Sequence, residues 1–292
     1  MTAARRRTIA AEVARDFAVS QRRVARGLGL ARSGLRYESA SPDRHRALIA
    51  RIEELAGRHP RYGYRRIWAT LRREGWRCNI KAVRRLWREA GLKLGRTPPA
   101  APPRRPHGQD KNGCHLRPSR GKDDVWTWDF TFDRTADGRS LKWLSLIDEF
   151  TRECLALEPG RSMTAADIRA ILASVAADRG GPPVRVRSDN GPEFAADAVR
   201  SWLESAGSGT LYVAPGSPWQ NGLAEAFHSR LRDEFLDREE FEDASQARAL
   251  GELWRREYNT ERPHSALGYK TPSEFAATCP RYVPNEEPAE PS

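Results

Sequence analysis

Three acidic residues stand where their carboxylates can act together. Asp129 lies in a segment that alternates apolar and polar residues, Asp189 comes just after a short apolar segment, and Glu225 lies in a helical stretch that follows residues 218–222. Adjacent parallel strands joined by right-handed crossovers can bring the first two residues to one edge of a sheet, and a helix can lay the third against them. The pattern predicts one site with three carboxylates.

Clustered carboxylates repel one another and raise their own pKa values, so such a cluster is costly unless a divalent cation neutralises it. Oxygen ligands with water completing the shell are the ligands that Mg²⁺ and Mn²⁺ prefer. Two such ions can activate an attacking hydroxyl and stabilise the leaving oxygen in phosphodiester transfer. The three residues therefore predict a site with Mg²⁺ or Mn²⁺, and with two ions.

The elements that would position this site form the second half of the chain. Residues 125–132 alternate with period two and predict a strand, and residues 141–147 and 154–157 predict two more, giving an antiparallel meander. Thr164 can cap a helix that ends before Gly180. A fourth strand at 184–186, a helix at 193–206 and a fifth strand at 211–213 complete an α/β sheet with helical cover.

The first half is predicted to be helical. Residues 8–36 read as short helices with Ser20 as a cap, and a longer helix follows residue 42. Another helix runs from a cap at Asn79 to Gly91, and its outer face carries Arg84, Arg85 and Arg88. Helices that pack their apolar faces and expose arginines are typical of helix-turn-helix modules that contact phosphates and enter a groove.

Charge is divided unevenly between the two halves. The 292 residues carry a net charge of +11, but residues 1–120 hold 30 Lys+Arg against 9 Asp+Glu, whereas residues 121–292 hold 20 against 30. The first half therefore has a net charge of +21, which favours a polyanionic partner, and the second half has −10. No stretch has the apolar length of a membrane span or a signal peptide, and the four cysteines include no CxxC pair.

These shifts of composition divide the chain into five predicted segments. They are a helix-turn-helix-like segment at 1–40, a second such DNA-binding region at 41–95, a Pro/Arg-rich linker at 96–122, a catalytic core with a C-terminal helix at 123–280, and a disordered tail at 281–292.

Motifs around the three acidic residues resemble a known family. Trp128-Asp129-Phe130, Ser188-Asp189-Asn190-Gly191-Pro192-Glu193-Phe194 and the segment 215–225 look like the DDE catalytic core of the IS-three family of bacterial insertion-sequence transposases, which are related to retroviral integrases. Between Asp189 and Glu225 lie 35 residues, the spacing of that family's signature. Segments 59–67, 147–153 and 258–272 also resemble family motifs.

The resemblance implies an RNase H-like integrase core, a mixed five-stranded sheet with flanking helices, after an all-α helix-turn-helix region. The core would cut the ends of a mobile element and join a 3′ hydroxyl to another phosphodiester. By position, Asp129 would bridge two Mg²⁺ ions, Asp189 would bind one and Glu225 the other, with water or a DNA hydroxyl as nucleophile.

The partners implied are the terminal inverted repeats, target DNA, further copies of this chain on DNA, and an upstream-frame helix-turn-helix protein or fusion. We expect a cytoplasmic, nucleoid-associated bacterial protein with no membrane contact.

Other acidic residues compete for the metal-binding roles. Asp133 shares strand parity with Asp129, and Asp123 and Asp124 precede it, but the aromatic residues around Asp129 favour that position. Asp148 and its neighbour Glu149 end the second strand, where turn carboxylates usually cap the backbone, so we expect a structural role for them.

Nine side chains are predicted to contact DNA: Arg65, Arg66, Arg84, Arg85, Arg88, Trp219, Gln220, Asn221 and Arg232. Two of these have open alternatives, since Arg232 could instead pair with Asp233 or another neighbour and Trp219 could be a buried anchor. Arg232 and His228 lie on the same helix face as Glu225, at i+7 and i+3. Phe227, Leu231 and Phe235 are predicted to be core residues, because they follow the helix period.

Two other functions remain open from the sequence. The chain could be a sequence-specific DNA-binding regulator with an inactive core, or an RNase H-like nuclease that digests RNA–DNA hybrids. Metal-dependent cleavage at element ends distinguishes a transposase from both alternatives.

Overall fold

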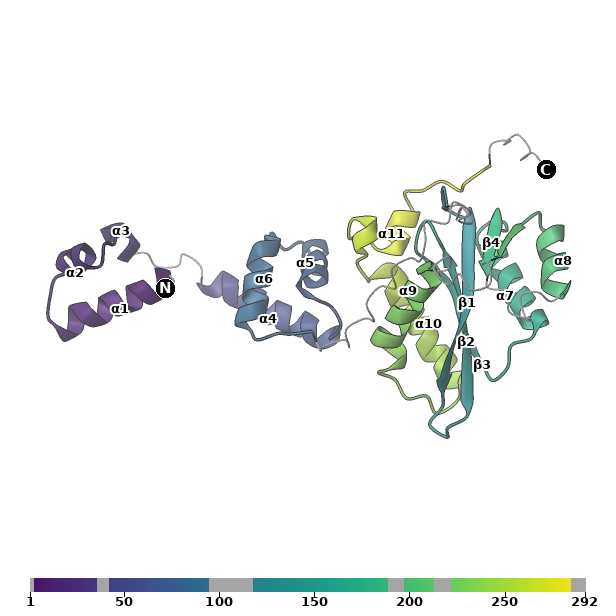
Figure 1. Ribbon diagram of the computed structural model, residues 1–292, viewed down its shortest axis with the longest axis horizontal. Helices are drawn as coiled ribbons and strands as arrows, with labels where there is room; N and C mark the ends of the chain where they lie inside the picture. The colour runs from purple at the N-terminus through teal and green to yellow at the C-terminus, as the bar shows by residue number, and fades with distance from the viewer. Residues whose placement is uncertain (1–2, 36–41, 95–117, 189–196, 213–221, 285–292) are drawn as a thin grey trace, which may run out of the picture. The chain divides into compact units, whose positions relative to one another are not determined.

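The computed structural model describes residues 3–35, 42–94, 118–188, 197–212 and 222–284 (Figure 1). The chain divides into two compact units, 1–55 and 56–292, and each is described by itself. The division falls inside helix α4 (Pro42–Arg58), so it does not coincide with the segment boundaries expected from composition. Those boundaries stay a prediction, and most of the expected linker (96–117 of 96–122) and of the tail (285–292 of 281–292) lies outside the described residues.

The first unit is helical, with α1 (Ala3–Asp16), α2 (Gln21–Gly27), α3 (Arg32–Leu35) and the beginning of α4. Ser20 caps α2 as expected, because its side chain accepts a hydrogen bond from the backbone N–H of Arg23 at 3.4 Å. Helix α1 begins five residues earlier than the apolar pattern predicted.

Two further helices belong to the second unit, α5 (Tyr64–Arg73) and α6 (Ile80–Glu89). Asn79 caps α6 by accepting a hydrogen bond from Lys81 N at 2.8 Å, which confirms the predicted start. The apolar sides of both helices are buried, and the arginines of α6 stay exposed on its other side as predicted. The region is the all-α one that the sequence predicted.

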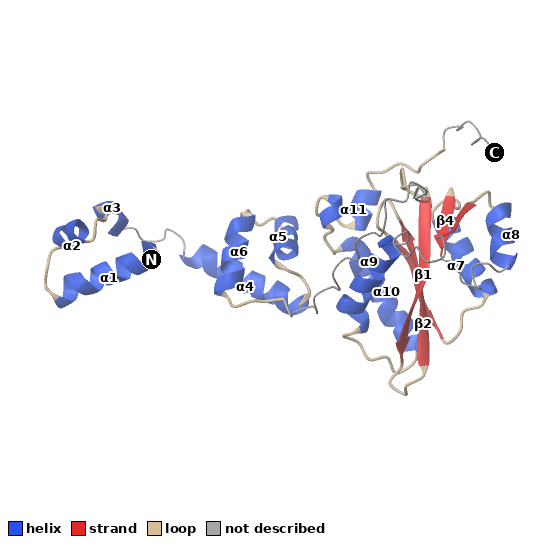
Figure 2. Cartoon of the chain, viewed as in Figure 1, coloured by secondary structure: helices blue, strands red, loops and turns tan. Residues whose placement is uncertain are grey.

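A mixed five-stranded sheet forms the centre of the second unit (Figure 2). Its strands lie in the order β3-β2-β1-β4-β5, with antiparallel pairs on the β3–β2–β1 side and parallel pairs on the β1–β4–β5 side. This confirms the predicted fold class. The bounds are β1 (Val125–Arg134), β2 (Ser140–Asp148), β3 (Cys154–Gly160), β4 (Arg185–Ser188) and β5 (Gly209–Tyr212).

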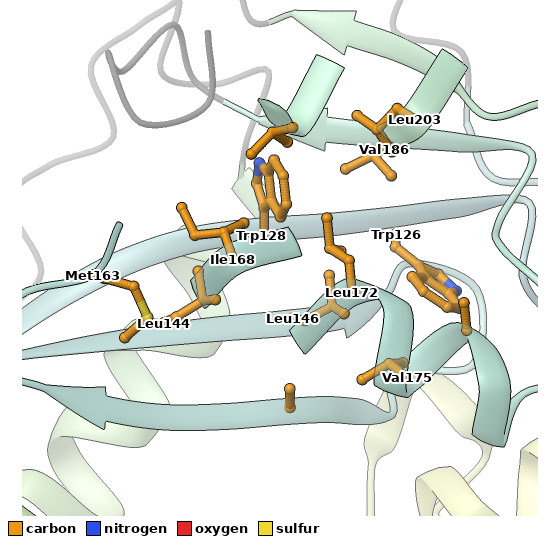
Figure 3. Close-up of a cluster of buried hydrophobic side chains, with 13 residues drawn as sticks. Trp126, Trp128, Leu144, Leu146, Met163, Ile168, Leu172, Val175, Val186 and Leu203 are labelled. Carbon is orange, nitrogen blue, oxygen red and sulfur yellow. The ribbon is translucent and has the colours of Figure 1, made fainter. Parts of the chain in front are cut away.

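Helices cover both faces of this sheet (Figure 2). One face carries α7 (Ala165–Asp178) and α8 (Asp197–Ser205), and their apolar side chains form a core with Trp126 and Trp128 of β1 (Figure 3). Thr164 caps α7 in a reciprocal capping box with Asp167, as its position predicted. Because side chains alternate along a strand, Thr127 and Asp129 point to the face opposite to these two tryptophans.

The opposite face carries α9 (Gly222–Leu231), the π-helical segment η2 (Arg232–Leu236) and α10 (Ala244–Thr260), followed by the 3-10 turn η3 (Ser265–Leu267) and α11 (Pro272–Ala276). Phe227, Leu231 and Phe235 are buried here, at 2%, 0% and 4% exposure, which confirms that they are core residues. Helix α10 lies very close to β2, since a Cβ added to Gly251 would stand 2.6 Å from a ring atom of Trp143. Within the described residues, no helix is long and apolar enough to cross a bilayer.

Candidate active site

Asp129 lies in the middle of β1 on the face that α9 covers. Its side chain is 23% exposed, and Oδ1 accepts a hydrogen bond from the backbone N–H of Phe130 at 2.7 Å. Oδ2 lies 3.6 Å from Nδ1 of His228, which comes from α9. The carboxylate is thus held at the surface of the sheet with one oxygen directed toward the helix.

Glu225 lies in the first turn of α9, and its side chain is exposed. Helix α9 packs against β1, so Glu225 and Asp129 come from two elements that are in contact on one face of the sheet. Asp189 lies outside the described residues. It comes directly after β4, whose parallel register pairs Arg187 with Thr127, and these two residues precede Asp189 and Asp129 by two positions each. The joint site of the three carboxylates stays a prediction.

His228 is part of this site, although sequence reasoning gave it no role beyond its place on the helix face of Glu225. Its Nε2 lies 2.8 Å from Oγ of Ser145, a fully buried residue of β2 that is paired with Asp129 in the strand register. Burial, with the nearby Arg232 charge as a second cause, lowers the pKa of His228 to about 4. The imidazole is therefore neutral at pH 7.

The acidic residues that competed for the metal-binding role have structural partners. Asp123 is buried and binds Arg179 at 2.8 Å, and it accepts a hydrogen bond from the indole of Trp126 at 3.0 Å. Asp148 accepts hydrogen bonds from the backbone N–H groups of Phe150 at 2.8 Å and Thr151 at 2.9 Å, as a turn-capping carboxylate does. Its pKa is raised to about 6, chiefly by burial.

The other neighbours behave in the same way. Glu149 binds Arg187 at 2.7 Å. Asp124 accepts a hydrogen bond from Arg120 N at 2.8 Å. The structural role expected for the carboxylates at the end of β2 is confirmed by these contacts.

Arg232 contacts the sheet. Its Nη2 donates hydrogen bonds to the carbonyl oxygen of Phe132 at 3.0 Å and to Oγ1 of Thr131 at 3.3 Å, and Nη1 lies 3.7 Å from Asp237. Of the two interpretations left open, an ion pair with a neighbour is observed, but the neighbour is Asp237. The phosphate contact stays a prediction.

The predicted DNA-contact arginines of α5 and α6 fall into two groups. Arg65, Arg84, Arg85 and Arg88 are exposed, and the three on α6 line one concave surface with Lys81. Arg66 differs from them, because its guanidinium binds Glu234 of the core at 3.0 Å and is 29% exposed. Its predicted DNA contact is untested, whereas its contact with the core is observed. The remaining three, Trp219, Gln220 and Asn221, lie outside the described residues.

The C-terminal motif, residues 258–272, begins in the last turn of α10, and its side chains hold α10 and η2 in place. Asn259 accepts a hydrogen bond from Cys154 N at 2.9 Å and donates one to Cys154 O at 2.8 Å, so its amide pairs with the backbone of β3. Arg262 donates two hydrogen bonds to Glu234 in η2, at 2.7 and 2.6 Å. These contacts fix α10 and η2, and η2 continues directly from the helix that carries Glu225.

The donors at the site fit a hard divalent cation, since Asp129 and Glu225 both supply carboxylate oxygens and neither side chain is buried. In the part of the chain that the structure describes, no group of three His, Cys, Asp or Glu residues is placed to hold a metal ion. The third predicted ligand, Asp189, falls outside that part.

Comparison with known proteins finds integrase core domains over residues 119–218 and 206–272, and an HTH-like domain over 43–100. The chain is 38% identical over 259 residues to the insertion element IS407 uncharacterized 31.7 kDa protein of Burkholderia multivorans, covering 89% of this chain and 91% of that protein. It is 30% identical over 240 residues to transposase InsD of insertion element IS2 from Escherichia coli, covering 78% and 77%.

Among solved structures, a chain of the simian T-cell lymphotropic virus intasome matches with a TM-score of 0.50 at 19% identity, over 61% of this chain and 63% of that chain. At this identity the likeness concerns the fold alone, which is that of the sheet and its helices. The family matches and the relatives together span the helical region and the catalytic half. The chain therefore belongs to the family of insertion-element transposases with an integrase core, the family that its motifs resemble.

Proposed function

We propose that this chain catalyses metal-dependent cleavage of DNA strands at the ends of an insertion sequence and their transfer to target DNA. The observation that carries the proposal is the position of Asp129 on β1 and Glu225 on α9, two elements that pack together on one face of an integrase-type sheet. Transposase relatives over most of the chain support the same reaction class.

The proposed metal-binding residues are Asp129, Asp189 and Glu225. Two Mg²⁺ or Mn²⁺ ions, when bound, supply activation of the attacking hydroxyl and stabilisation of the leaving oxygen. The chain's own side chains hold the three carboxylates close together and position the scissile phosphodiester of the DNA beside them. No side-chain nucleophile is needed, because water or a DNA hydroxyl attacks the phosphodiester.

DNA is the proposed partner of the helical region. The exposed arginines Arg65, Arg84, Arg85 and Arg88 suit contacts with phosphates, since each presents a guanidinium to solvent. Because two element ends must be held at once, we propose that further copies of this chain assemble on DNA. An upstream-frame helix-turn-helix protein is a further proposed partner.

The reaction is tested with the purified full chain, labelled element ends and Mg²⁺. Asp129→Asn and Glu225→Gln are expected to abolish strand cleavage and joining while the protein still binds the DNA ends. Asp133→Asn is the matched control, because Asp133 shares the strand and parity of Asp129 and accepts a hydrogen bond from the neighbouring backbone N–H of Arg134 at 2.8 Å. Cleavage that persists in Asp129→Asn would contradict the proposal.

The same assay separates the alternatives. Binding to element ends with no cleavage under Mg²⁺ or Mn²⁺ would favour a regulator with an inactive core. Digestion of RNA–DNA hybrids without preference for element ends would favour a nuclease.

A further inference from the structure

His228 joins three elements of the active site through one imidazole ring. It lies three residues after Glu225 on α9, so both side chains leave the same face of the helix one turn apart. Its Nδ1 lies 3.6 Å from Oδ2 of Asp129 on β1, and its Nε2 lies 2.8 Å from Oγ of Ser145 on β2. The ring is thus in contact with the strand that carries one proposed metal ligand and belongs to the helix that carries another.

Asp129, His228 and Ser145 follow one another in space as the acid, histidine and serine of a hydrolytic triad do. The burial of Ser145 excludes nucleophilic attack by its hydroxyl on a substrate. A triad serine must be reached by substrate. Ser145 is fully buried, and its Oγ lies 3.2 Å from the carbonyl oxygen of Asp129 and closer, at 2.8 Å, to Nε2 of His228. The serine therefore lies beneath the imidazole as a support, not beside it as a nucleophile.

The contacts suit one tautomer of the ring. A carboxylate only accepts hydrogen bonds, so Nδ1 must carry the proton for a favourable approach to Asp129, and Nε2 then accepts from the Ser145 hydroxyl. At 3.6 Å the approach to Oδ2 is longer than a hydrogen bond and acts electrostatically. The other oxygen, Oδ1, is oriented by Phe130 N at 2.7 Å. The carboxylate is therefore oriented from both sides, and neither contact closes off the direction of solvent.

We propose that His228 is a positioning residue that orients the carboxylate of Asp129 and sets the spacing between β1 and α9, and with it the spacing of Asp129 from Glu225. The proposal rests on the proposed function, since the two carboxylates must bind metal for their spacing to be important. Groups that orient a metal-binding side chain typically change metal affinity about 10- to 100-fold when they are removed. The same loss is expected here.

The test is a titration of the full chain with Mn²⁺ in the absence of DNA. Electron paramagnetic resonance of the unbound ion measures how much Mn²⁺ the protein binds. His228→Ala is expected to weaken Mn²⁺ binding about 10- to 100-fold. His228→Asn keeps an N–H near the position of Nδ1, so its affinity is expected to return close to that of the unaltered chain. His228→Gln reaches the position of Nε2 and is expected to behave like His228→Ala.

Ser229→Ala is the matched control, because Ser229 follows His228 on α9 and is exposed. DNA cleavage should rank the variants in the same order. His228→Ala should need a higher Mg²⁺ concentration than the unaltered chain for half-maximal cleavage rate, and its rate should differ less from that of the unaltered chain at saturating Mg²⁺. If His228→Ala does not fold, the Mn²⁺ affinities of His228→Asn and His228→Gln are compared instead. Equal Mn²⁺ affinity of these two variants, or unaltered affinity in His228→Ala, would overturn the proposal.

The failure of the proposed function has a different signature. In that case Asp129→Asn would leave Mn²⁺ binding and cleavage unchanged, whatever the His228 variants do. If Asp129→Asn abolishes Mn²⁺ binding and His228→Ala leaves it intact, the metal site stands and only the positioning role is wrong.

Discussion

The buried ion pair between Arg262 and Glu234 gives the sharpest prediction for stability. Arg262 is 3% exposed and Glu234 is 10% exposed, and two hydrogen bonds join them. Burial alone would raise the pKa of Glu234, but the hydrogen bonds and charge of Arg262 outweigh it and hold that pKa below its usual value. Glu234 is therefore ionised at neutral pH and needs a partner.

Replacing Arg262 by Met leaves that carboxylate with Arg66 as its remaining observed partner, at 3.0 Å. Breaking a buried pair from one side costs about 3 to 5 kcal/mol when the remaining charge has no other partner. Because Arg66 still compensates part of the Glu234 charge, we expect a loss at the lower end of this range, about 3 kcal/mol. Replacing both partners by Met removes both charges of the pair and keeps apolar volume. Arg66 loses Glu234 in this double variant, but its side chain is 29% exposed and water can hydrate it, so the double variant is expected to be more stable than Arg262→Met alone. A double-mutant cycle of Arg262→Met, Glu234→Met and the double variant should therefore show a large favourable coupling energy between the two positions.

Urea unfolding followed by tryptophan fluorescence measures the effect, since Trp143 and Trp254 belong to the core cluster on this face of the sheet. Arg248→Met is the control, because the Arg248–Glu158 pair is 62% and 37% exposed and should contribute at most about 1 kcal/mol. A loss below about 1 kcal/mol for Arg262→Met would refute the reasoning, as would a double variant as unstable as the sum of the single ones.

Three further predictions test other parts of the structure. Asn259→Ala leaves Cys154 N without its side-chain partner, whereas Cys154 O keeps the hydrogen bond from Arg255 Nη1 at 3.2 Å, so the loss should be about 1 to 3 kcal/mol, measured by urea unfolding; a loss near zero would contradict the bracing role. His264 has its pKa lowered to about 2, first by burial and then by Arg262, Arg230, Arg66 and Arg152, so only the unfolded chain gains its proton below pH 6.5. The free energy of unfolding should therefore fall as pH decreases from 6.5 to 4.5, and His264 should contribute up to about 1.4 kcal/mol of this fall per pH unit. Measured by urea unfolding at several pH values, His264→Asn should lower the slope of stability against pH by that amount. Parallel plots for the two proteins would exclude this contribution of His264. Arg84→Ala should reduce the slope of log K for DNA binding against log salt by about 0.9, and Arg66→Ala should leave it unchanged; equal changes in both would show that Arg66 also binds phosphate.

The sequence predicted the elements wherever one local signal decided them. Caps at Ser20, Asn79 and Thr164 stand where their side chains can satisfy the first N–H groups of a helix, and all three are observed. The period-two pattern of β1 predicted a strand with two faces, and the structure gives those faces to two different helix layers. Such signals act over a few residues, so a single sequence carries them.

Long-range contacts were beyond the same reasoning. The bond from Asn259 to β3 joins residues 105 positions apart, and the role of His228 depends on which β2 residue stands beside Asp129 in the register. Helix spacing could place His228 on the face of Glu225, but only the antiparallel register brings Ser145 beneath it. For Asp189 the arguments are the family signature and the parallel register of β4 with β1, and its contact with the other two carboxylates stays a prediction.

The positive charge of the first half has carboxylate partners within the chain, besides the proposed DNA. Arg61 binds Asp233 at 3.1 Å, Arg66 binds Glu234, and Arg73 binds Glu274 at 2.9 Å, so arginines of the helical region pair with carboxylates of the acidic half. Part of the positive charge counted in the first half is therefore neutralised inside the chain. A guanidinium already held by a carboxylate must give up that partner before it can bind DNA, so Arg65, Arg84 and Arg88 are better placed for phosphates than Arg85, which lies 3.8 Å from Glu89. Net charge predicts that an anion binds, whereas the choice of arginines depends on which carboxylates the fold brings within reach.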